Sequence, residues 1–222
     1  MQEPIRPIRI DFVSDVACPW CAIGLAGLER ALGELGPEVP VEIRFQPFEL
    51  NPQMPAEGED VTEHLTRKYG STPAQQEASR AAIRERGASL GFTFNPAGRS
   101  RIWNTFDAHR LLYWAGLEGR QRELKNALLR AYHGESHNPG DPAVLLASAV
   151  EAGLDADRAR AVIESDDYTD EVRERERFYQ QSGITAVPSV ILDEKYLIQG
   201  GQPPETFLQA LRRLAQQRAE NS

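Results

Sequence analysis

The stretch SDVACPWCAIG, residues 14–24, holds both cysteines of the 222-residue chain, with two residues between them. Residues 8–13, just before it, alternate between apolar and polar side chains, as in a strand. After it, leucines recur at spacings of three and four, which is typical of a helix; they are Leu25, Leu28, Leu32 and Leu35. The cysteine pair is therefore predicted to lie where a strand ends and a helix begins.

The start of a helix favours a thiolate at Cys18. The first backbone N–H groups of a helix lack partners within the helix, and the aligned peptide dipoles place partial positive charge there. We therefore expect the pKa of Cys18, at or beside the N-cap, to lie below that of a free cysteine. Pro19 suits the first helical position, where an N–H is not needed. Cys21, one turn further along, is predicted to be the more buried, resolving thiol.

Two other interpretations of the pair remain open: two inert core cysteines, or half of a zinc site. Zinc sites normally use four protein ligands, or three and a water, and the chain has no further cysteine. His133 and His137 are four residues apart, but glycines and a proline surround them. No metal site is predicted.

Composition narrows the class of protein. The net charge is −8, and the 22 arginines and three lysines are scattered, which argues against a nucleic-acid partner. No apolar run approaches the roughly 18 residues of a membrane span, and the N-terminal residues do not resemble a signal peptide. We therefore expect no membrane association and a cytoplasmic location, where a Cys-x-x-Cys pair more often does redox work than structural work.

The rest of the chain divides into three parts. A strand at 41–46 completes a strand–helix–strand unit, which should be parallel and right-handed. After a loop at 51–60, about 120 residues read as helical. Strands at 188–193 and 196–198 then form a hairpin, followed by a last helix that opens at Pro203 and Pro204. The predicted order is βαβ, a helical block, and ββα.

This order resembles the thioredoxin fold, and the helical block resembles that of the DsbA family. Four motifs are similar to those of FrnE-type proteins, which are relatives of 2-hydroxychromene-2-carboxylate isomerases and kappa-class glutathione transferases. The motifs are SDVACPWC at 14–21, NT at 104–105 with AHRL at 108–111, GITAVP at 183–188, and GGQP at 200–203. The resemblance implies an α/β thioredoxin fold, formed by residues 1–58 and 184–222, with an all-helical domain inserted at 59–183.

In that family, the proline that matches Pro188 is cis and lies against the cysteine pair. An X-Pro bond is the one peptide bond in which the cis form costs little. A cis turn would bring the backbone of Val187 beside Cys18, as an edge for an extended substrate. The alternative is an ordinary proline at the start of a strand.

The cysteine motif separates two activities within this resemblance. The isomerases and kappa transferases commonly have serine at the position of Cys18, where it holds glutathione. With cysteine at both positions, dithiol chemistry is favoured. DsbA itself has histidine at the position of Trp20, and tryptophan cannot place a positive charge beside the thiolate, so we predict a less oxidising pair than that of DsbA.

Further candidates each have two interpretations. Asp11 could be a buried carboxylate beneath Cys21 that accepts its proton, or a solvated residue of the strand. Asp15 is predicted to act in a turn or cap, and Asn104 either to reach the mouth of the site, as a substrate-binding residue, or to cap a helix. An aromatic group is predicted to form interdomain core, or else to line a substrate groove; it comprises Trp103, Phe106, Tyr113 and Trp114.

The sequence thus predicts a thiol–disulfide oxidoreductase in which Cys18 attacks and Cys21 resolves the mixed disulfide. Its partners would be protein or small-molecule thiols and disulfides, with an external reductant such as glutathione or a thioredoxin system. No tightly bound cofactor is expected, and glutathione is a candidate co-substrate. The alternatives are a glutathione-dependent isomerase or transferase that uses the same cleft, and a non-enzymatic chaperone that binds apolar peptides.

Overall fold

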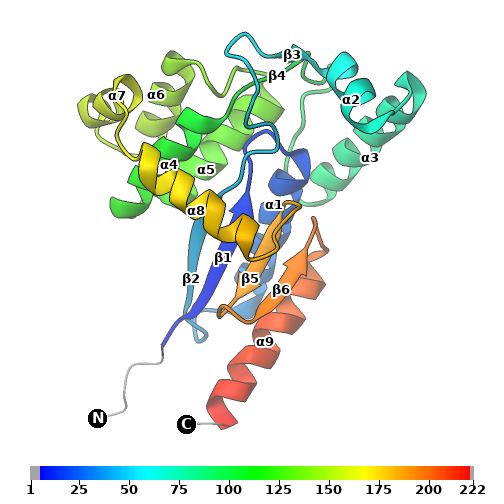
Figure 1. The fold of residues 1–222 in the computed structure, drawn as a ribbon. Helices are drawn as coiled ribbons and strands as arrows, with labels where there is room; N and C mark the ends of the chain where they lie inside the picture. The colour runs from blue at the N-terminus through cyan, green and yellow to red at the C-terminus, as the bar shows by residue number, and fades with distance from the viewer. Residues whose placement is uncertain (1–5, 221–222) are drawn as a thin grey trace.

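A four-stranded sheet forms the centre of the molecule, in a computed structural model that describes residues 6–220. Its strand order is β2-β1-β5-β6. β1 (Ile8–Ser14) pairs in parallel with β2 (Val41–Pro47), whereas β5 (Ser189–Leu192) is antiparallel to both β1 and β6 (Tyr196–Gln199). The predicted parallel βαβ unit and the later ββ hairpin are both confirmed, and they share one sheet (Figure 1).

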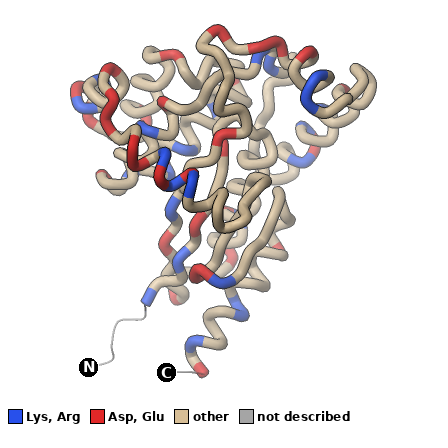
Figure 2. Tube along the Cα trace, in the orientation of Figure 1, with Lys and Arg blue, Asp and Glu red and all other residues tan. Residues whose placement is uncertain are grey.

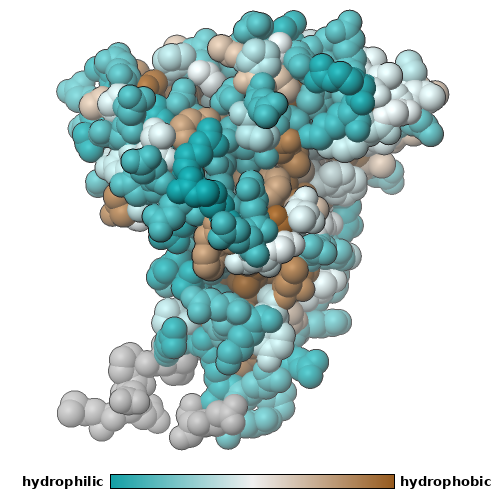
Figure 3. Space-filling model, viewed as in Figure 1, coloured by the Kyte–Doolittle hydropathy of each residue, from teal (hydrophilic) through white to brown (hydrophobic). Residues whose placement is uncertain are grey.

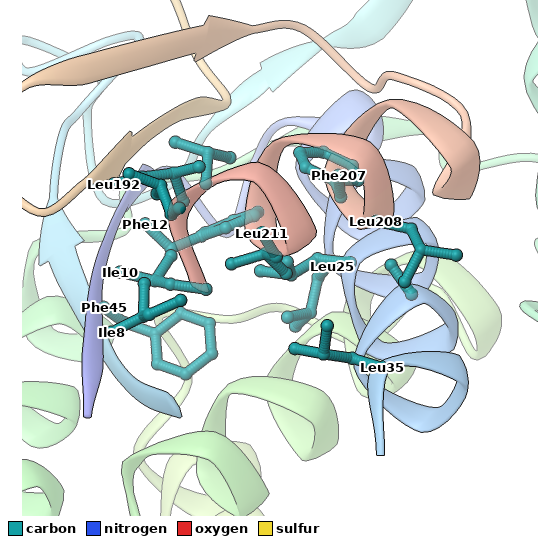
Figure 4. Packing of buried hydrophobic residues seen from close by; sticks show 14 of the residues in the cluster. Ile8, Ile10, Phe12, Leu25, Leu35, Phe45, Leu192, Phe207, Leu208 and Leu211 are labelled. Atoms are coloured by element: carbon teal, nitrogen blue, oxygen red, sulfur yellow. The ribbon is translucent and has the colours of Figure 1, made fainter. Parts of the chain in front are cut away.

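Helices cover both faces of this sheet. α1 (Pro19–Leu35) and α9 (Pro204–Glu220) pack together on one face, where alternate residues of β1 meet their leucines. Figure 4 shows this core, with Ile8, Ile10 and Phe12 facing Leu25 and Leu211. α8 (Thr169–Gln181) lies on the other face, where Tyr179 joins Val13 in a smaller apolar cluster.

The segment between β2 and β5 is mostly helical and gathers at the end of the sheet where α1 begins (Figure 1). α6 and α7 lie on one side of this end and α2 and α3 on the other. Before α8, its helices are α2 (Val61–Tyr69), α3 (Pro73–Ser89), α4 (Phe106–Leu117), α5 (Gln121–Leu129), the π-helix η1 (Arg130–Gly134), α6 (Pro142–Glu151) and α7 (Ala156–Glu164).

The structure adds a small two-stranded sheet that the helical pattern did not reveal. β3 (Glu59–Asp60) pairs antiparallel with β4 (Arg101–Ile102), so the chain before α4 is extended and that helix begins at Phe106 rather than at Trp103. The pairing of β3 with β4 brings together the two ends of the segment that contains α2 and α3. These two helices are thereby held beside the start of α1, where they form one wall of a cleft.

The family-like division into domains at 58/59 and 183/184 stays a prediction, and its outermost residues, 1–5 and 221–222, lie outside the described residues. Basic and acidic residues are spread over the described chain (Figure 2). Hydrophilic residues cover most of the face shown in Figure 3, with apolar residues near its middle. Within residues 6–220, no helix has the length and apolar character needed to cross a membrane.

Candidate active site

Cys18 is the N-cap residue of α1, and Pro19 occupies the first turn, as predicted. The backbone N–H of Cys18 donates to the carbonyl of Asp15 (3.2 Å), which fixes the turn between β1 and the helix. Cys18 and Cys21 are both reduced and lie 3.6 Å apart. Cys18 retains 5% exposure and reaches the cleft, whereas Cys21 is fully buried.

The pKa values of the two thiols are shifted in opposite directions. The pKa of Cys18 is lowered, first because the Cys21 thiol donates a hydrogen bond to its sulfur, and further because the backbone N–H groups of Cys21 and Trp20 point at it. The pKa of Cys21 is raised well above that of an ordinary cysteine by burial and by the neighbouring Cys18 sulfur. The negative charge therefore belongs on Cys18, and the proton on Cys21.

A loop from the second half of the fold lies directly against this pair. The Val187–Pro188 peptide bond is cis, as the resemblance implied. The thiol of Cys18 is placed to donate to the carbonyl oxygen of Val187, at 3.7 Å. Pro188 packs so closely on α1 that a Cβ atom at Gly24 would lie 2.9 Å from its Cγ atom. A glycine at position 24 is what allows this approach.

Two side chains hold the carbonyl groups that precede Cys18. The Nε2 atom of His133, from η1, donates to the carbonyl of Val16 at 2.8 Å, and Arg99 donates to the carbonyl of Ala17 at 2.6 Å. Arg99 also donates to Nδ1 of His133 (3.5 Å). Burial, and then the charge of Arg99, lower the pKa of His133 well below 6.5, so this imidazole stays neutral.

Asp15 is buried at the junction of the sheet and the helical segment. Its carboxylate accepts hydrogen bonds from the N–H groups of Ala17 (3.0 Å) and Leu50 (2.7 Å) and from the hydroxyl of Thr105 (2.8 Å). Although burial acts in the opposite direction, His109, whose Nε2 lies 3.6 Å from the carboxylate, and these N–H groups lower the pKa of Asp15. The predicted role in the turn is confirmed, and the carboxylate also joins residues from three parts of the chain.

Cys18 opens into a cleft of about 630 Å³. One wall is formed by α2 and α3, including Tyr69 and Ile83, and the other by Trp20 and the loop 185–187. Trp20 is 41% exposed and extends from the active-site helix into this space. The cleft is large enough for a small thiol or for a few residues of an extended peptide.

A family model, the DSBA-like thioredoxin domain, matches residues 9–212, which is nearly the whole chain. The chain belongs to this DsbA-like family. YwbO of Bacillus subtilis is 28% identical to it over 205 residues, which are 92% of this chain and 96% of YwbO.

Two solved structures are also similar. A probable DsbA oxidoreductase from Streptomyces coelicolor is 37% identical, with a TM-score of 0.83, over 93% of this chain and 89% of that one. The cytosolic disulfide reductase DsbM from Pseudomonas aeruginosa, solved with GSH, has a TM-score of 0.65 at 17% identity, over 94% of this chain and 99% of that one, and is similar in fold alone.

Two predictions about this DsbA-like site, for Asp11 and Asn104, need correction. Asp11 is buried, but neither beneath Cys21 nor in solvent, because it faces Tyr179 of α8. Its carboxylate accepts a hydrogen bond from Gln46 of β2 (2.6 Å) and pairs with Arg9 of β1 (2.9 Å). Asn104 is not among the residues that line the cleft; it lies in the turn before α4, where its Oδ1 accepts from the N–H of Phe106 (2.8 Å), while Thr105 is the N-cap residue of that helix. The aromatic group of Trp103, Phe106, Tyr113 and Trp114 does not line the cleft, and Trp114 lies in the core with Trp103 packed against it, as first predicted.

Arg99, His133 and Lys125 are the residues around the pair that sequence reasoning missed. Lys125 of α5 is fully buried, and its charge interacts with both cysteines. A signal for Lys125 exists, because it lies three and seven residues before Leu128 and Tyr132 and so shares the buried stripe of its helix. The placement of His133 depends on the π-helical turn, which the sequence pattern does not show.

Proposed function

We propose that this DsbA-like protein is a thiol–disulfide oxidoreductase in which Cys18 is the attacking thiolate and Cys21 the resolving thiol. The observation that carries the proposal is the pair itself. The one sulfur that reaches the cleft has a lowered pKa, and its neighbour, 3.6 Å away, holds a proton in a buried position. A low-pKa, accessible thiolate beside a resolving cysteine is the arrangement that disulfide exchange requires.

The reaction has two exchange steps. The Cys18 thiolate attacks one sulfur of a substrate disulfide, which forms a mixed disulfide and releases the first substrate thiolate. Cys21 then attacks the sulfur of Cys18, which forms the Cys18–Cys21 disulfide and releases the second thiolate. The backbone carbonyl of Val187, 3.7 Å from the Cys18 sulfur, is available to an N–H group of the bound substrate. An external thiol reduces the pair again by the reverse steps.

We further propose that a small anionic thiol, with glutathione as the candidate, is one partner. The described residues that line the cleft include three arginines, Arg80, Arg84 and Arg99, and no Asp or Glu. Arg80 and Arg84 share a carboxylate, that of Glu77, outside the cleft, and Arg99 bonds to a carbonyl and a histidine instead. DsbM, solved with GSH, supports this choice. Its cytosolic origin makes the cytoplasm our proposed location for this chain as well.

Trapping of the mixed disulfide tests the proposal. A Cys21→Ser variant mixed with oxidised glutathione should form a stable adduct of one glutathione on Cys18, detected by mass spectrometry. The wild type should instead form the internal disulfide and release two thiols. Cys18→Ser should form neither the glutathione adduct nor the internal disulfide. It is the matched control, because it makes the same sulfur-to-oxygen change at the other cysteine.

Two results would oppose the proposal. If Cys21→Ser forms no adduct with glutathione disulfide or with a disulfide-bonded peptide, Cys18 is not an attacking thiolate. If the wild type binds glutathione without any exchange and isomerises a glutathione-dependent substrate, the isomerase alternative replaces it.

A further inference from the structure

One arginine of the cleft has no acidic partner. Arg99 lies in the loop between α3 and β4, and its Nη1 atom donates to the carbonyl of Ala17 (2.6 Å) and to an imidazole nitrogen (3.5 Å). No carboxylate pairs with this guanidinium in the described part of the chain. Glu77, by contrast, pairs with both Arg80 (3.0 Å) and Arg84 (3.1 Å). Arg99 therefore brings an uncompensated positive charge to the cleft.

The guanidinium is held in place by its own surroundings. Its central carbon lies 5.1 Å from the centre of the Tyr132 ring, and the loop that carries it is tied to η1 and to the turn after η1. The N–H of Asn95 donates to the carbonyl of His133 (2.9 Å), and the hydroxyl of Ser136 donates to the carbonyl of Gly98 (3.2 Å). An arginine that is already ordered loses little conformational entropy when it binds a ligand.

The free edge of this guanidinium is accessible, close to the attacking cysteine. Because Nη1 makes both hydrogen bonds, Nε and Nη2 have no carbonyl or carboxylate acceptor among the described residues, and neither atom is fully buried. Ala17 directly precedes Cys18, and consecutive Cα atoms are about 3.8 Å apart. The bond to the Ala17 carbonyl therefore places Arg99 one peptide group from Cys18, and both side chains line the same cleft.

We propose that Arg99 binds a carboxylate of the substrate that lies a few bonds from the disulfide under attack by Cys18. A guanidinium and a carboxylate match in shape, because two parallel N–H donors meet the two oxygens. The inference rests on the proposed function and names the residue that selects its substrates. These substrates are disulfides of thiols that carry a carboxylate, a class that includes glutathione.

The carboxylate takes no part in the bond changes of the reaction. The Cys18 thiolate attacks one substrate sulfur, the bond between these two sulfurs forms, and the sulfur–sulfur bond of the substrate breaks. The other half of the substrate leaves as a thiolate with both electrons of the broken bond. Arg99 determines which disulfides are held beside Cys18, and it neither attacks nor transfers a proton.

Three small disulfides with the same arm of two methylene groups test this role. Dithiodipropionate ends in carboxylates, bis(hydroxyethyl) disulfide is neutral, and cystamine ends in ammonium groups. The Cys21→Ser variant is mixed with each of them, and mass spectrometry gives the rate at which the mixed disulfide forms on Cys18. Each rate is divided by that of the same disulfide with mercaptoethanol, which removes differences in intrinsic reactivity.

The normalised rate should be about tenfold higher for dithiodipropionate than for the neutral disulfide, at the lower end of what a hydrogen bond to a charged group contributes. The net charge of the chain, −8, would by itself favour cystamine instead. A preference for the carboxylate therefore requires a local positive group.

Variants in the same background assign the preference to one arginine. In Arg99→Gln the two normalised rates should become equal, because glutamine keeps an N–H donor for the Ala17 carbonyl but carries no charge. Arg99→Lys should keep part of the preference, since it retains the charge without the planar fork. Arg80→Gln should reduce the preference less than Arg99→Gln, because Arg80 already has a carboxylate partner. Arg213→Gln, at an exposed position of α9, should leave the preference intact.

The ratio of the two rates separates recognition of the substrate from other roles of Arg99. The same Cys18 thiolate attacks all three disulfides, so a change in the pKa of Cys18 cancels in the ratio. A guanidinium that only stabilised the departing thiolate would accelerate all three reactions alike.

Equal normalised rates for the carboxylate and the neutral disulfide, or a preference that survives in Arg99→Gln, would overturn the role of Arg99 and leave the oxidoreductase intact. Absence of a mixed disulfide with all three compounds would instead be a failure of the proposed function itself.

Discussion

At the scale of single residues, the reactivity of Cys18 depends on donors that the fold supplies around one sulfur. The Cys21 thiol and the N–H groups of α1 point at it, and the carbonyl groups of the two residues before it accept hydrogen bonds from His133 and Arg99. A carbonyl that turned towards the sulfur would disfavour the thiolate. The neutral state of His133 is therefore part of the site, although His133 does not touch the sulfur.

This neutrality predicts a stability that depends on pH. The pKa of His133 in the folded protein lies well below its unfolded value of 6.5. As the pH falls below 6.5, the unfolded chain gains a proton that the folded protein does not, so the free energy of unfolding should decrease by up to about 1.4 kcal/mol per pH unit until the folded pKa is reached. Urea unfolding at pH 7 and pH 5 measures it.

The control for His133 is His133→Gln, which keeps an N–H donor for the Val16 carbonyl but does not titrate. This variant should lose less stability than the wild type between pH 7 and pH 5. Equal losses in the two proteins would show that His133 is not responsible.

At the scale of elements, the site exists because the loop before β5 packs on the first turns of α1. Pro188 approaches Gly24, and Gly201 approaches Trp20 and Ile23, each at a distance that leaves little or no room for a side chain. The second half of the fold is thereby positioned against the helix that carries the cysteines. The contact between Cys18 and Val187 depends on this packing.

A pair of glycines in α1 tests this packing. Gly24→Ala places a methyl group 2.9 Å from Pro188, and we expect a loss of about 1–3 kcal/mol in the free energy of unfolding, together with slower attack by Cys18. Gly33 lies in the same helix with no atom within 4 Å of an added Cβ, so Gly33→Ala should stabilise the protein by about 0.5–1 kcal/mol. Denaturant unfolding and the adduct rate measure both; equal effects of the two changes would contradict the packing.

At the scale of the whole molecule, Asp15 joins the sheet to the helical segment. It receives hydrogen bonds from the turn before α1, from the loop after β2 and from Thr105 before α4. Its negative charge also raises the pKa of Cys18, against the effect of the donors around the sulfur. The same carboxylate therefore stabilises the assembly and weakens the thiolate.

Asp15→Asn should separate these two effects. The amide loses acceptor capacity for buried donors, so the free energy of unfolding should fall by about 1–3 kcal/mol. The pKa of Cys18, measured by thiolate absorbance, should fall as well, since a negative charge is removed. Thr105→Val removes one donor and keeps the charge, so it should cost about 1 kcal/mol without lowering the pKa of Cys18. A higher pKa of Cys18 in Asp15→Asn would contradict this balance.

Much of this architecture could be predicted from the sequence, because local patterns determine it. Cys18 and Pro19 mark the start of a helix, alternation marks β1 and β2, and Val187–Pro188 marks the return of the chain. The surroundings of Asp11 could not be found in this way. Asp11 was a candidate for a carboxylate beneath Cys21, but strand alternation turns it towards Tyr179 of α8, where it accepts a hydrogen bond from Gln46. Contacts between distant segments decide such positions, and no local pattern reports them.

The most direct test of the central claim, that Cys18 and Cys21 form one exchange-active pair, is a redox titration in glutathione buffers. The ratio of reduced to oxidised glutathione is varied, and the fraction of internal disulfide is read by mass spectrometry after acid quenching. We predict one transition, in which both cysteines oxidise together with two-electron dependence and which is absent in Cys18→Ser. A wild-type protein that forms no Cys18–Cys21 disulfide at any ratio would contradict the claim.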